Sequence, residues 1–359
     1  MKKMHAGLIL AGLFTLNTAV LSQAATIYWG GGENGVWHEA SNWSLRIPEF
    51  RDVVTSASGA PGEWPVDIQA NAVVGRILQS NWSGETIFGK TGNPFGVSLT
   101  FGGASNAAVT RNLGNMTFNV NLAHTYDAGI TDFTWSYGAQ GATTVNGDVS
   151  LGSYNWNVTK TANGYADTTV NGTISGSGGL ILGNSSASLA TRMFLTDENT
   201  YTGATTLNNN THLILNGGTL GNANITIGGG AIEQDAWLAG DAVNKGTVRL
   251  NIANDTADLI TLANAYGRLQ LTNLNLELNF TGTQSLGTYI LADYSANTVN
   301  GLDGIAFNQV TGADGWSIDY AYNEGTQIAL VIPEPGALAL FGVAGLLLAA
   351  WRRTTGSRA

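Results

Sequence analysis

The chain has 359 residues, a formal net charge of −10 at pH 7, 48 glycines and no cysteine. Lack of cysteine excludes a disulfide framework, a thiol nucleophile and a zinc–thiolate site. The acidic balance argues against DNA, RNA or anionic lipid as partners.

The N-terminal segment has the pattern of a secretory signal peptide. Lys2 and Lys3 precede an apolar stretch over residues 6–21, and small residues follow at residues 22–25. A basic start, a short apolar run and a small-residue site predict export, with cleavage near Ala24 or Ala25. We therefore assign residues 1–25 to a signal peptide and leave them out of the fold.

The exported region indicates an all-β fold. Removal of both terminal segments leaves 10 basic and 24 acidic residues, a net charge of about −14. Between residues 26 and 332, short Val, Ile, Leu, Thr and Phe runs alternate with Asn-Gly and Gly-Gly turns, and no amphipathic helix stands out. Such a chain relies on sheet hydrogen bonds and core packing for its stability.

The first part, residues 26–122, is rich in tryptophan. We expect an N-terminal β cap followed by the first coils, because the bare end of a stacked sheet would expose strand edges and apolar surface. Trp37, Trp43 and Trp64 are candidates for an aromatic platform that stacks on sugar rings. The alternative is that these rings are buried in the cap.

Residues 123–250 contain an internal repeat. The sequence Thr-Thr-Val-Asn-Gly at residues 143–147 returns at 168–172, and a looser copy follows at 205–209. Repeats of about 20 to 40 residues are typical of solenoids, in which each coil buries its inward side chains on the next. The sequence therefore predicts a β-solenoid in which Asn and Thr form ladders along the turns.

Residues 176–227 refine this prediction. They contain Gly-Gly-Leu-Ile-Leu at 178–182, Asn-Thr-Tyr-Thr-Gly at 199–203 and Gly-Thr-Leu at 218–220. This pattern resembles the autotransporter-associated β-strand repeat, which implies a right-handed parallel β-helix. The chain shows one good copy, and residues 185–193 depart from the spacing. No outer-membrane barrel pattern follows, so the autotransporter export mechanism is not carried over.

We assign residues 251–332 to the final β coils and a C-terminal cap. The leucines from Leu269 to Phe280 alternate imperfectly, which indicates one strand with a bulge. Residues 316–332 predict a hairpin that turns at residues 323–325.

The C-terminal segment, residues 333–359, has the pattern of a sorting tail. Pro333, Glu334 and Pro335 precede an uncharged apolar run at residues 336–351, and Arg352 and Arg353 follow. Sixteen helical residues would span about 24 Å, slightly less than the hydrocarbon core of a membrane. We expect a transmembrane helix with its arginines in the cytoplasm.

This tail resembles the PEP-CTERM sorting signal of Gram-negative bacteria. The resemblance implies that an exosortase-type membrane protease recognises the tail and cuts it at or near Pro333, Glu334 and Pro335. It also implies an inner-membrane-anchored precursor, a mature protein at the cell surface or in the extracellular matrix, and an association with exopolysaccharide.

Candidate catalytic and metal-binding residues are few. His38, His124 and His212 are far apart in sequence, and we expect ordinary surface or turn roles for them. The acidic pair Asp197 and Glu198 predicts a solvated loop, with calcium as the alternative ligand. Weaker acidic pairs are Asp255 with Asp258 and Asp303 with Asp314.

The functional expectation is a non-catalytic, exported structural or adhesive β-solenoid of the envelope matrix or biofilm. We expect no cofactor and no metal. Expected partners are the exosortase-type protease and, further, exopolysaccharide or surface glycans. The alternative is a carbohydrate-binding or polysaccharide-degrading β-helix protein, since two carboxylates from neighbouring coils could flank a sugar chain.

Overall fold

The computed structural model describes residues 24–331, apart from residues 31–34, 57–63, 80–83, 90–95, 104, 139, 163–165, 186–188, 222–223, 230–233, 285–286 and 299–300. Most of the expected signal peptide, the whole sorting tail and the expected helix at 336–351 lie outside the described residues. Within the described residues, no helix combines the length and the apolar character needed to cross a membrane.

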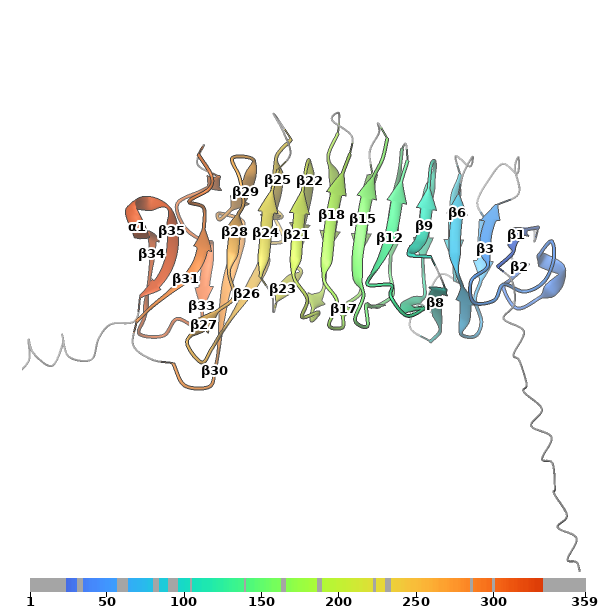
Figure 1. Ribbon diagram of the computed structural model, residues 1–359, viewed down its shortest axis with the longest axis horizontal. Coiled ribbons are helices and arrows are strands. Elements are labelled where there is room, and N and C mark those ends of the chain that lie inside the picture. Colours follow the sequence, from blue (N-terminus) through green and yellow to red (C-terminus); the bar gives the residue numbers. More distant parts are fainter. Residues whose placement is uncertain are drawn as a thin grey trace, which may run out of the picture.

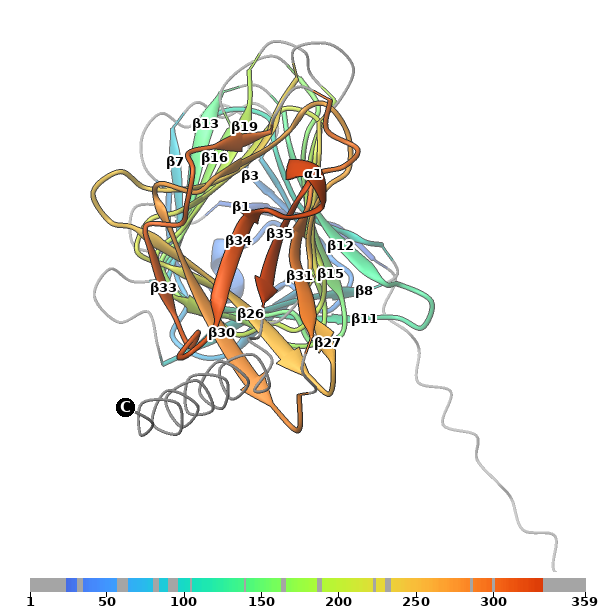
Figure 2. The same ribbon diagram turned by 90° about the vertical axis from the view of Figure 1, so that its left-hand side faces the viewer.

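The described chain is a long coil of parallel strands. From β3 to β33, each turn contributes a strand to each of three faces, as when β12, β13 and β14 are followed by β15, β16 and β17. Figure 1 shows the strands side by side along a rod, from the blue N-terminal end to the red C-terminal end. In the view along the rod, the faces surround one interior (Figure 2). The all-β prediction is confirmed, and the parallel sheets are those of a β-solenoid.

The first face is a 13-stranded sheet that runs the length of the rod. Its last two strands, β35 and β34, are antiparallel to their neighbours. In sheet order the strands are β1 (Thr26–Trp29), β3 (Val53–Ser56), β6 (Arg76–Gln79), β9 (Ala107–Arg111), β12 (Asp132–Tyr137), β15 (Asn155–Lys160), β18 (Leu180–Asn184), β21 (Thr205–Asn208), β24 (Ile225–Gly228), β28 (Ile260–Leu262), β31 (Thr288–Asp293), β35 (Gln327–Val331) and β34 (Ser317–Ala321).

The second face is an 11-stranded parallel sheet. Its strands are β2 (Gly35–Val36), β4 (Trp64–Asp67), β7 (Glu85–Phe88), β10 (Asn115–Phe118), β13 (Gly141–Val145), β16 (Ala166–Val170), β19 (Thr191–Leu195), β22 (Thr211–Leu215), β25 (Ala236–Gly240), β29 (Gly267–Gln270) and β32 (Leu302–Asp303).

The third face is divided into two sheets. The break falls between β17 and β20, where the Asn199 side chain accepts the Ile174 N–H at 3.0 Å in place of a backbone carbonyl. One sheet contains β5 (Ala72–Val74), β8 (Ser98–Gly103), β11 (Asn121–Tyr126), β14 (Val149–Ser150) and β17 (Ile174–Ser175). The other contains β20 (Glu198–Asn199), β23 (Thr219–Gly221), β26 (Gly246–Ala253), β30 (Leu274–Thr281) and β33 (Gln309–Thr311), with β27 (Thr256–Ala257) antiparallel to β26.

Period-two alternation produces the core. In most strands every second residue is buried, because side chains of a strand point alternately to the two faces of its sheet. Between β7 and β15 the interior is aromatic, and Phe118, Trp135 and Trp156 follow one another at ring distances of 5.4 and 4.8 Å. Toward the C-terminus, leucine and isoleucine replace the aromatic rings in the core.

The repeat at residues 143–147 and 168–172 is confirmed as a coil repeat. Strands β13 and β16 pair in register, with Thr143 opposite Thr168. At the corner that follows, the Asn171 amide donates to Asn146 and the Asn146 amide donates to Asn119, each at 2.7 Å. Such a ladder satisfies polar groups where the chain turns between faces, which explains why asparagine recurs there.

The looser copy at residues 205–209 is not the next step of this repeat. Its threonines lie on β21 in the first sheet, and Thr205 pairs with Leu180. The true successor on the second sheet is β19, where Met193 lies opposite Thr168. The prediction was wrong because Thr-rich strands occur on two faces, and composition alone does not distinguish the faces.

The C-terminal region gives one correction and one confirmation. Leu269 lies on β29, and the apolar residues from Leu274 to Phe280 lie on β30, on a different face. Leu271 lies between the two strands, so the irregular alternation marks a corner and not a bulge. The hairpin is confirmed: β34 and β35 are antiparallel and flank the short α1 (Tyr322–Gly325). Left-handed backbone angles at residues 323–325 make this turn.

Candidate functional site

A tryptophan cluster lies at the N-terminal end of the interior. The Trp43 ring packs edge-on against Trp29 at 4.6 Å and against Trp37 at 4.8 Å, beside the 3-10 helix η1 (Ala40–Asn42). The Trp43 indole N–H donates to the Trp37 carbonyl at 2.6 Å.

These positions correct the stacking interpretation for two of its three residues. Trp37 is fully buried and Trp43 is 6% exposed, so neither ring offers a face to a sugar. The large apolar area of tryptophan is used here in packing. Trp64 lies on β4, and its side chain is outside the described residues.

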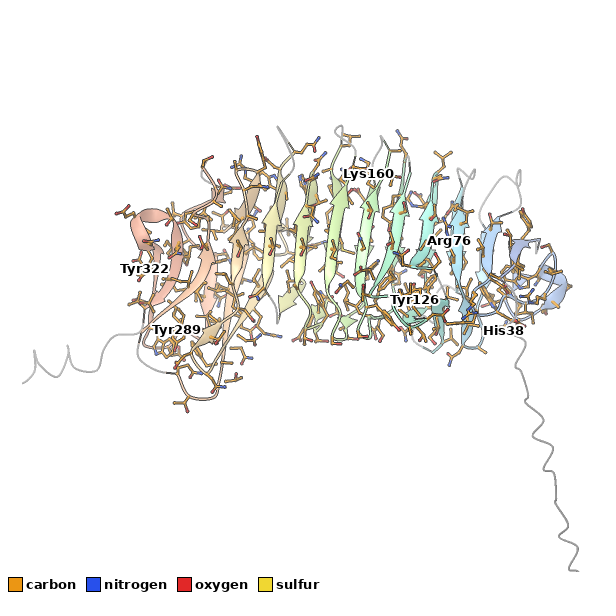
Figure 3. The ribbon with its side chains drawn as sticks, in the orientation of Figure 1. His38, Arg76, Tyr126, Lys160, Tyr289 and Tyr322 are labelled. Carbon is orange, nitrogen blue, oxygen red and sulfur yellow. The ribbon has the colours of Figure 1, made fainter. Side chains whose placement is uncertain are left out.

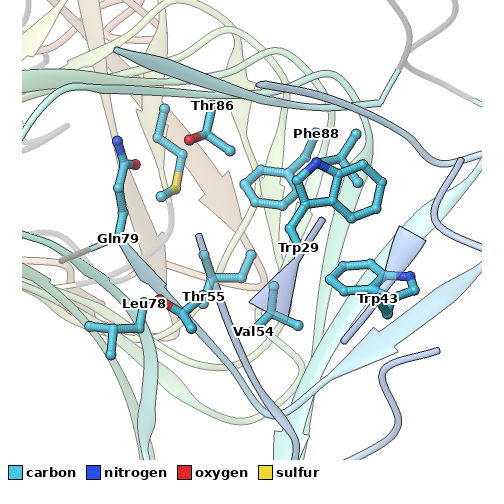
Figure 4. Close-up of a pocket in the computed structure, with 11 residues that line it drawn as sticks. Trp29, Trp43, Val54, Thr55, Leu78, Gln79, Thr86 and Phe88 are labelled. Carbon is cyan, nitrogen blue, oxygen red and sulfur yellow. The ribbon is translucent and has the colours of Figure 1, made fainter. Parts of the chain in front are cut away.

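Beside this cluster lies a small cavity of about 20 Å³, lined by Trp29, Trp43, Gln79 and Thr86 among others (Figure 4). Within the described part of the chain, neither the Gln79 amide nor the Thr86 hydroxyl has a hydrogen-bond partner. The space suits about one water molecule, which would satisfy such buried polar groups. It is too small for a sugar ring.

A second set of buried polar groups lies near the corner between the first and second sheets. Arg111 is 1% exposed, donates to the Gly114 and Gly141 carbonyls at 2.7 and 2.9 Å, and lies 4.6 Å from the centre of the Tyr137 ring. One turn beyond Tyr137, Lys160 donates to the Leu189 carbonyl at 2.6 Å. Lys160 is the last residue of β15, and Figure 3 shows it near the edge of the rod. These cations bind backbone carbonyls, which is a structural role.

The three histidines occupy different environments. His38 is exposed at the N-terminal end of the rod (Figure 3), and its ring contacts the Asn71 carbonyl at 3.3 Å. His124, expected at the surface, is buried: its ring lies 3.4 Å from that of Phe133 and Nδ1 donates to the Ser150 carbonyl at 3.1 Å. Burial lowers the pKa of His124 to about 3. His212 is half-buried on β22, and burial, followed by the charge of Arg192, lowers its pKa.

The acidic pair at residues 197–198 belongs to a network of side chains. The Asp197 carboxylate accepts from the Glu198 N–H and the Thr173 hydroxyl, at 2.8 and 3.2 Å. Glu198 forms an ion pair with Arg249 at 2.9 Å, and Arg249 reaches Glu277 at 3.0 Å. Both carboxylates have partners on neighbouring coils, Asp197 through Thr173 and Glu198 through Arg249.

The weaker acidic pairs also contact neighbouring coils or strands. Asp255 accepts from the Tyr289 hydroxyl at 2.8 Å, Asp258 from the Asn251 amide at 2.8 Å, and Asp303 from Gln270 at 3.1 Å. Asp255 and Asp258 flank β27, and Asp303 ends β32. No group of three or more His, Asp or Glu side chains suited to a metal occurs among the residues that the structure describes.

An open recess of about 510 Å³ lies at the C-terminal end, beside the hairpin β34–β35. Its lining includes Tyr294, Tyr320 and Asn297. The Tyr294 hydroxyl donates to the Tyr320 carbonyl at 3.1 Å, and the Asn297 amide donates to the Asn264 carbonyl at 2.9 Å. These polar groups hold the last coils together.

Comparison with known proteins identifies the tail and leaves the solenoid unassigned. Residues 331–353 match the family described as the PEP-CTERM protein-sorting motif. The comparison with curated proteins and the comparison with solved structures gave no match. The match begins at Val331, the last residue of β35, so the motif follows directly on the final hydrogen-bonded strand of the rod. The chain therefore carries a PEP-CTERM sorting motif, which implies export and recognition by an exosortase.

Proposed function

We propose that this protein is a non-catalytic structural or adhesive β-solenoid, displayed at the cell surface or in the extracellular matrix. The observation that carries the proposal is the junction at Val331, where a sorting motif follows directly on the last strand of a rod. An exosortase acting there would release or attach an intact, folded solenoid.

The side surface of the rod supports an adhesive role. Outward positions on β12 and β15 are occupied by short polar residues such as Thr134, Ser136, Asn157 and Thr159. Repeated over many coils, such side chains provide extended, weak and multivalent contacts.

Several finer features belong to the same proposal. Residues 1–25 are removed on export, and residues 336–351 span the inner membrane until processing, with Arg352 and Arg353 in the cytoplasm. The tryptophan cluster and the hairpin β34–β35 act as end caps that protect the edges of the stack. The coil winds right-handedly, as parallel β-crossover connections do.

Replacement of both prolines of the motif tests the sorting role. In the native host, the double variant Pro333→Ala, Pro335→Ala is expected to accumulate as a membrane-bound precursor, whereas wild type reaches the surface or the medium. Ser357→Ala, in the same tail but outside the matched residues, is the control and is expected to behave as wild type. Normal surface delivery of the proline variant would contradict the proposal.

The absence of catalysis is tested separately. The purified protein is expected to release no reducing ends or unsaturated products from neutral or acidic polysaccharides. Turnover that one carboxylate substitution abolishes would establish the polysaccharide-degrading alternative instead.

A further inference from the structure

The outer surface of the second sheet changes character between β16 and β29. The strand registers place five outward residues in one row along the rod, each opposite the next. A second row lies beside it on the same strands. The first row is Asp167, Arg192, His212, Trp237 and Arg268; the second is Thr169, Phe194, Ile214 and Ala239. We call these two rows the outer patch.

Aromatic rings occupy three consecutive strands of the outer patch. Phe194 lies on β19, His212 on β22 and Trp237 on β25, all at half-buried, outward positions. The His212 and Trp237 rings are 6.0 Å apart. Neighbouring strands are about 4.8 Å apart, so Phe194 and Trp237 present two apolar surfaces on the order of 10 Å apart along the rod.

Ion pairs flank the rings on both sides. Arg192 binds Asp167 through two hydrogen bonds of 2.6 and 2.9 Å, and its guanidinium lies 5.7 Å from the centre of the Phe194 ring. Arg268 binds Asp235 at 3.2 Å. The four charged side chains are 23 to 40% exposed, so they can still meet a ligand.

The balance of charge narrows the class of ligand. Two arginines and two aspartates cancel, and His212 is neutral at pH 7 because its pKa is lowered. The rest of the exported chain is acidic, at about −14, and repels polyanions. A lipid surface would require an apolar patch without ion pairs, and a peptide strand would find no free backbone groups on a sheet face.

A neutral saccharide meets these conditions. The C–H face of a sugar ring packs on an aromatic face by dispersion and by attraction to the ring quadrupole, and sugar hydroxyls both donate to carboxylates and accept from guanidinium groups. We propose that the outer patch binds a neutral polysaccharide chain, with sugar rings on Phe194 and Trp237 and hydroxyls on the flanking ion pairs. This inference gives a partner to the adhesive role and rests on the proposed surface location.

Affinity electrophoresis of the purified exported protein tests the inference. Native gels contain hydroxyethyl cellulose or galactomannan as neutral probes, or alginate as a polyanionic probe. Wild type is expected to be retarded by at least one neutral polymer and not by alginate. Phe194→Thr and Trp237→Thr are each expected to weaken retardation. In the double variant, the dissociation constant obtained from the retardation is expected to rise by about tenfold or more.

The matched control is Tyr28→Thr, which removes an exposed aromatic ring from β1, at the far N-terminal end of the rod. It is expected to leave retardation unchanged. Threonine suits outward strand positions, so all variants should keep the wild-type circular dichroism spectrum and melting temperature.

Four results would overturn the inference: no retardation by either neutral polymer, retardation by alginate alone, retardation that the double variant retains, or a wild-type dimer that the double variant loses in sedimentation. The last would make the outer patch an interface between two copies. The gel assay does not depend on sorting, so its failure is distinguishable from failure of the localisation test.

Discussion

Burial of His124 makes a quantitative prediction for acid stability. The ring is 6% exposed, lies between Phe101 and Phe133, and donates through Nδ1 to the Ser150 carbonyl. Loss of water around the ring lowers the folded-state pKa from 6.5 to about 3. As the pH falls below about 6.5, the unfolded chain takes up a proton at this residue and the folded chain does not.

The sign and size of the effect follow from this linkage. The contribution of His124 to stability is complete above the unfolded pKa of 6.5 and is lost as the pH falls toward 3. The loss is about 1.4 kcal/mol per pH unit, or about 2.5 kcal/mol between pH 7 and pH 4.5. His124→Phe removes the titrating group and keeps an aromatic ring in the stack. At pH 7 it should cost about 1 kcal/mol, for the hydrogen bond to Ser150.

Urea unfolding of the purified exported protein at pH 7 and about pH 4.5 measures this difference. Wild type is expected to lose about 2.5 kcal/mol more than His124→Phe over that interval. His38→Phe, which changes an exposed histidine, is the control and is expected to follow wild type. Parallel acid destabilisation of wild type and His124→Phe would refute the reasoning.

Four further substitutions test the contacts between coils. Gly172→Ala would place a methyl carbon 2.3 Å from the Gly147 carbonyl oxygen and is expected to cost about 2 to 4 kcal/mol in urea unfolding. Gly183→Ala is the control and should be almost neutral, because the nearest atom to its added methyl carbon is 3.8 Å away. Asn146→Ala removes two ladder hydrogen bonds and should cost about 1 to 2 kcal/mol; an unchanged urea midpoint would mean that the ladder does not stabilise the fold. Arg249→Met breaks two ion pairs that are open to solvent and should lower the free energy of unfolding by less than about 1 kcal/mol. The loss should be smaller in 1 M salt, which screens the pairs in wild type. A loss that salt does not reduce would contradict this.

The solenoid could be predicted from local sequence patterns that do not require the strand register to be known. The recurrence of Thr-Thr-Val-Asn-Gly reflects two strands that pair side by side, and a glycine at a point where a side chain would strike the neighbouring coil. The hairpin at residues 316–332 could be predicted because Asn323 and Gly325 are residue types that favour turns. Both adopt left-handed backbone angles in the structure. Each signal is carried by a stretch of about five residues or fewer, although the two copies of Thr-Thr-Val-Asn-Gly are 25 residues apart.

Features that depend on the strand register could not be predicted from the sequence. The first row of the outer patch recurs at uneven intervals: Arg192 lies opposite His212, His212 opposite Trp237, and Trp237 opposite Arg268. Uneven coil lengths hide such a row from any search for a fixed period. His124 shows the same limit, since only the coil that surrounds it reveals that its position on β11 points inward.

The burial of Trp37 and Trp43 could not be predicted from the sequence either. An aromatic residue serves equally well as a core residue or as a binding surface, and the sequence near Trp37 and Trp43 does not distinguish the two. Alternation within a strand would have helped, but these residues lie outside the regular strands, next to η1. Trp237, in contrast, occupies an outward position in a regular strand.

The central claim is that a folded solenoid is sorted through the tail that follows Val331. Mass spectrometry of the mature C-terminus, with cell fractions and medium from the native host kept separate, tests it most directly. The account predicts a terminus near Pro333 to Pro335 in the envelope or the medium. An intact tail that retains Arg352 and Arg353 and is confined to the inner membrane would contradict it.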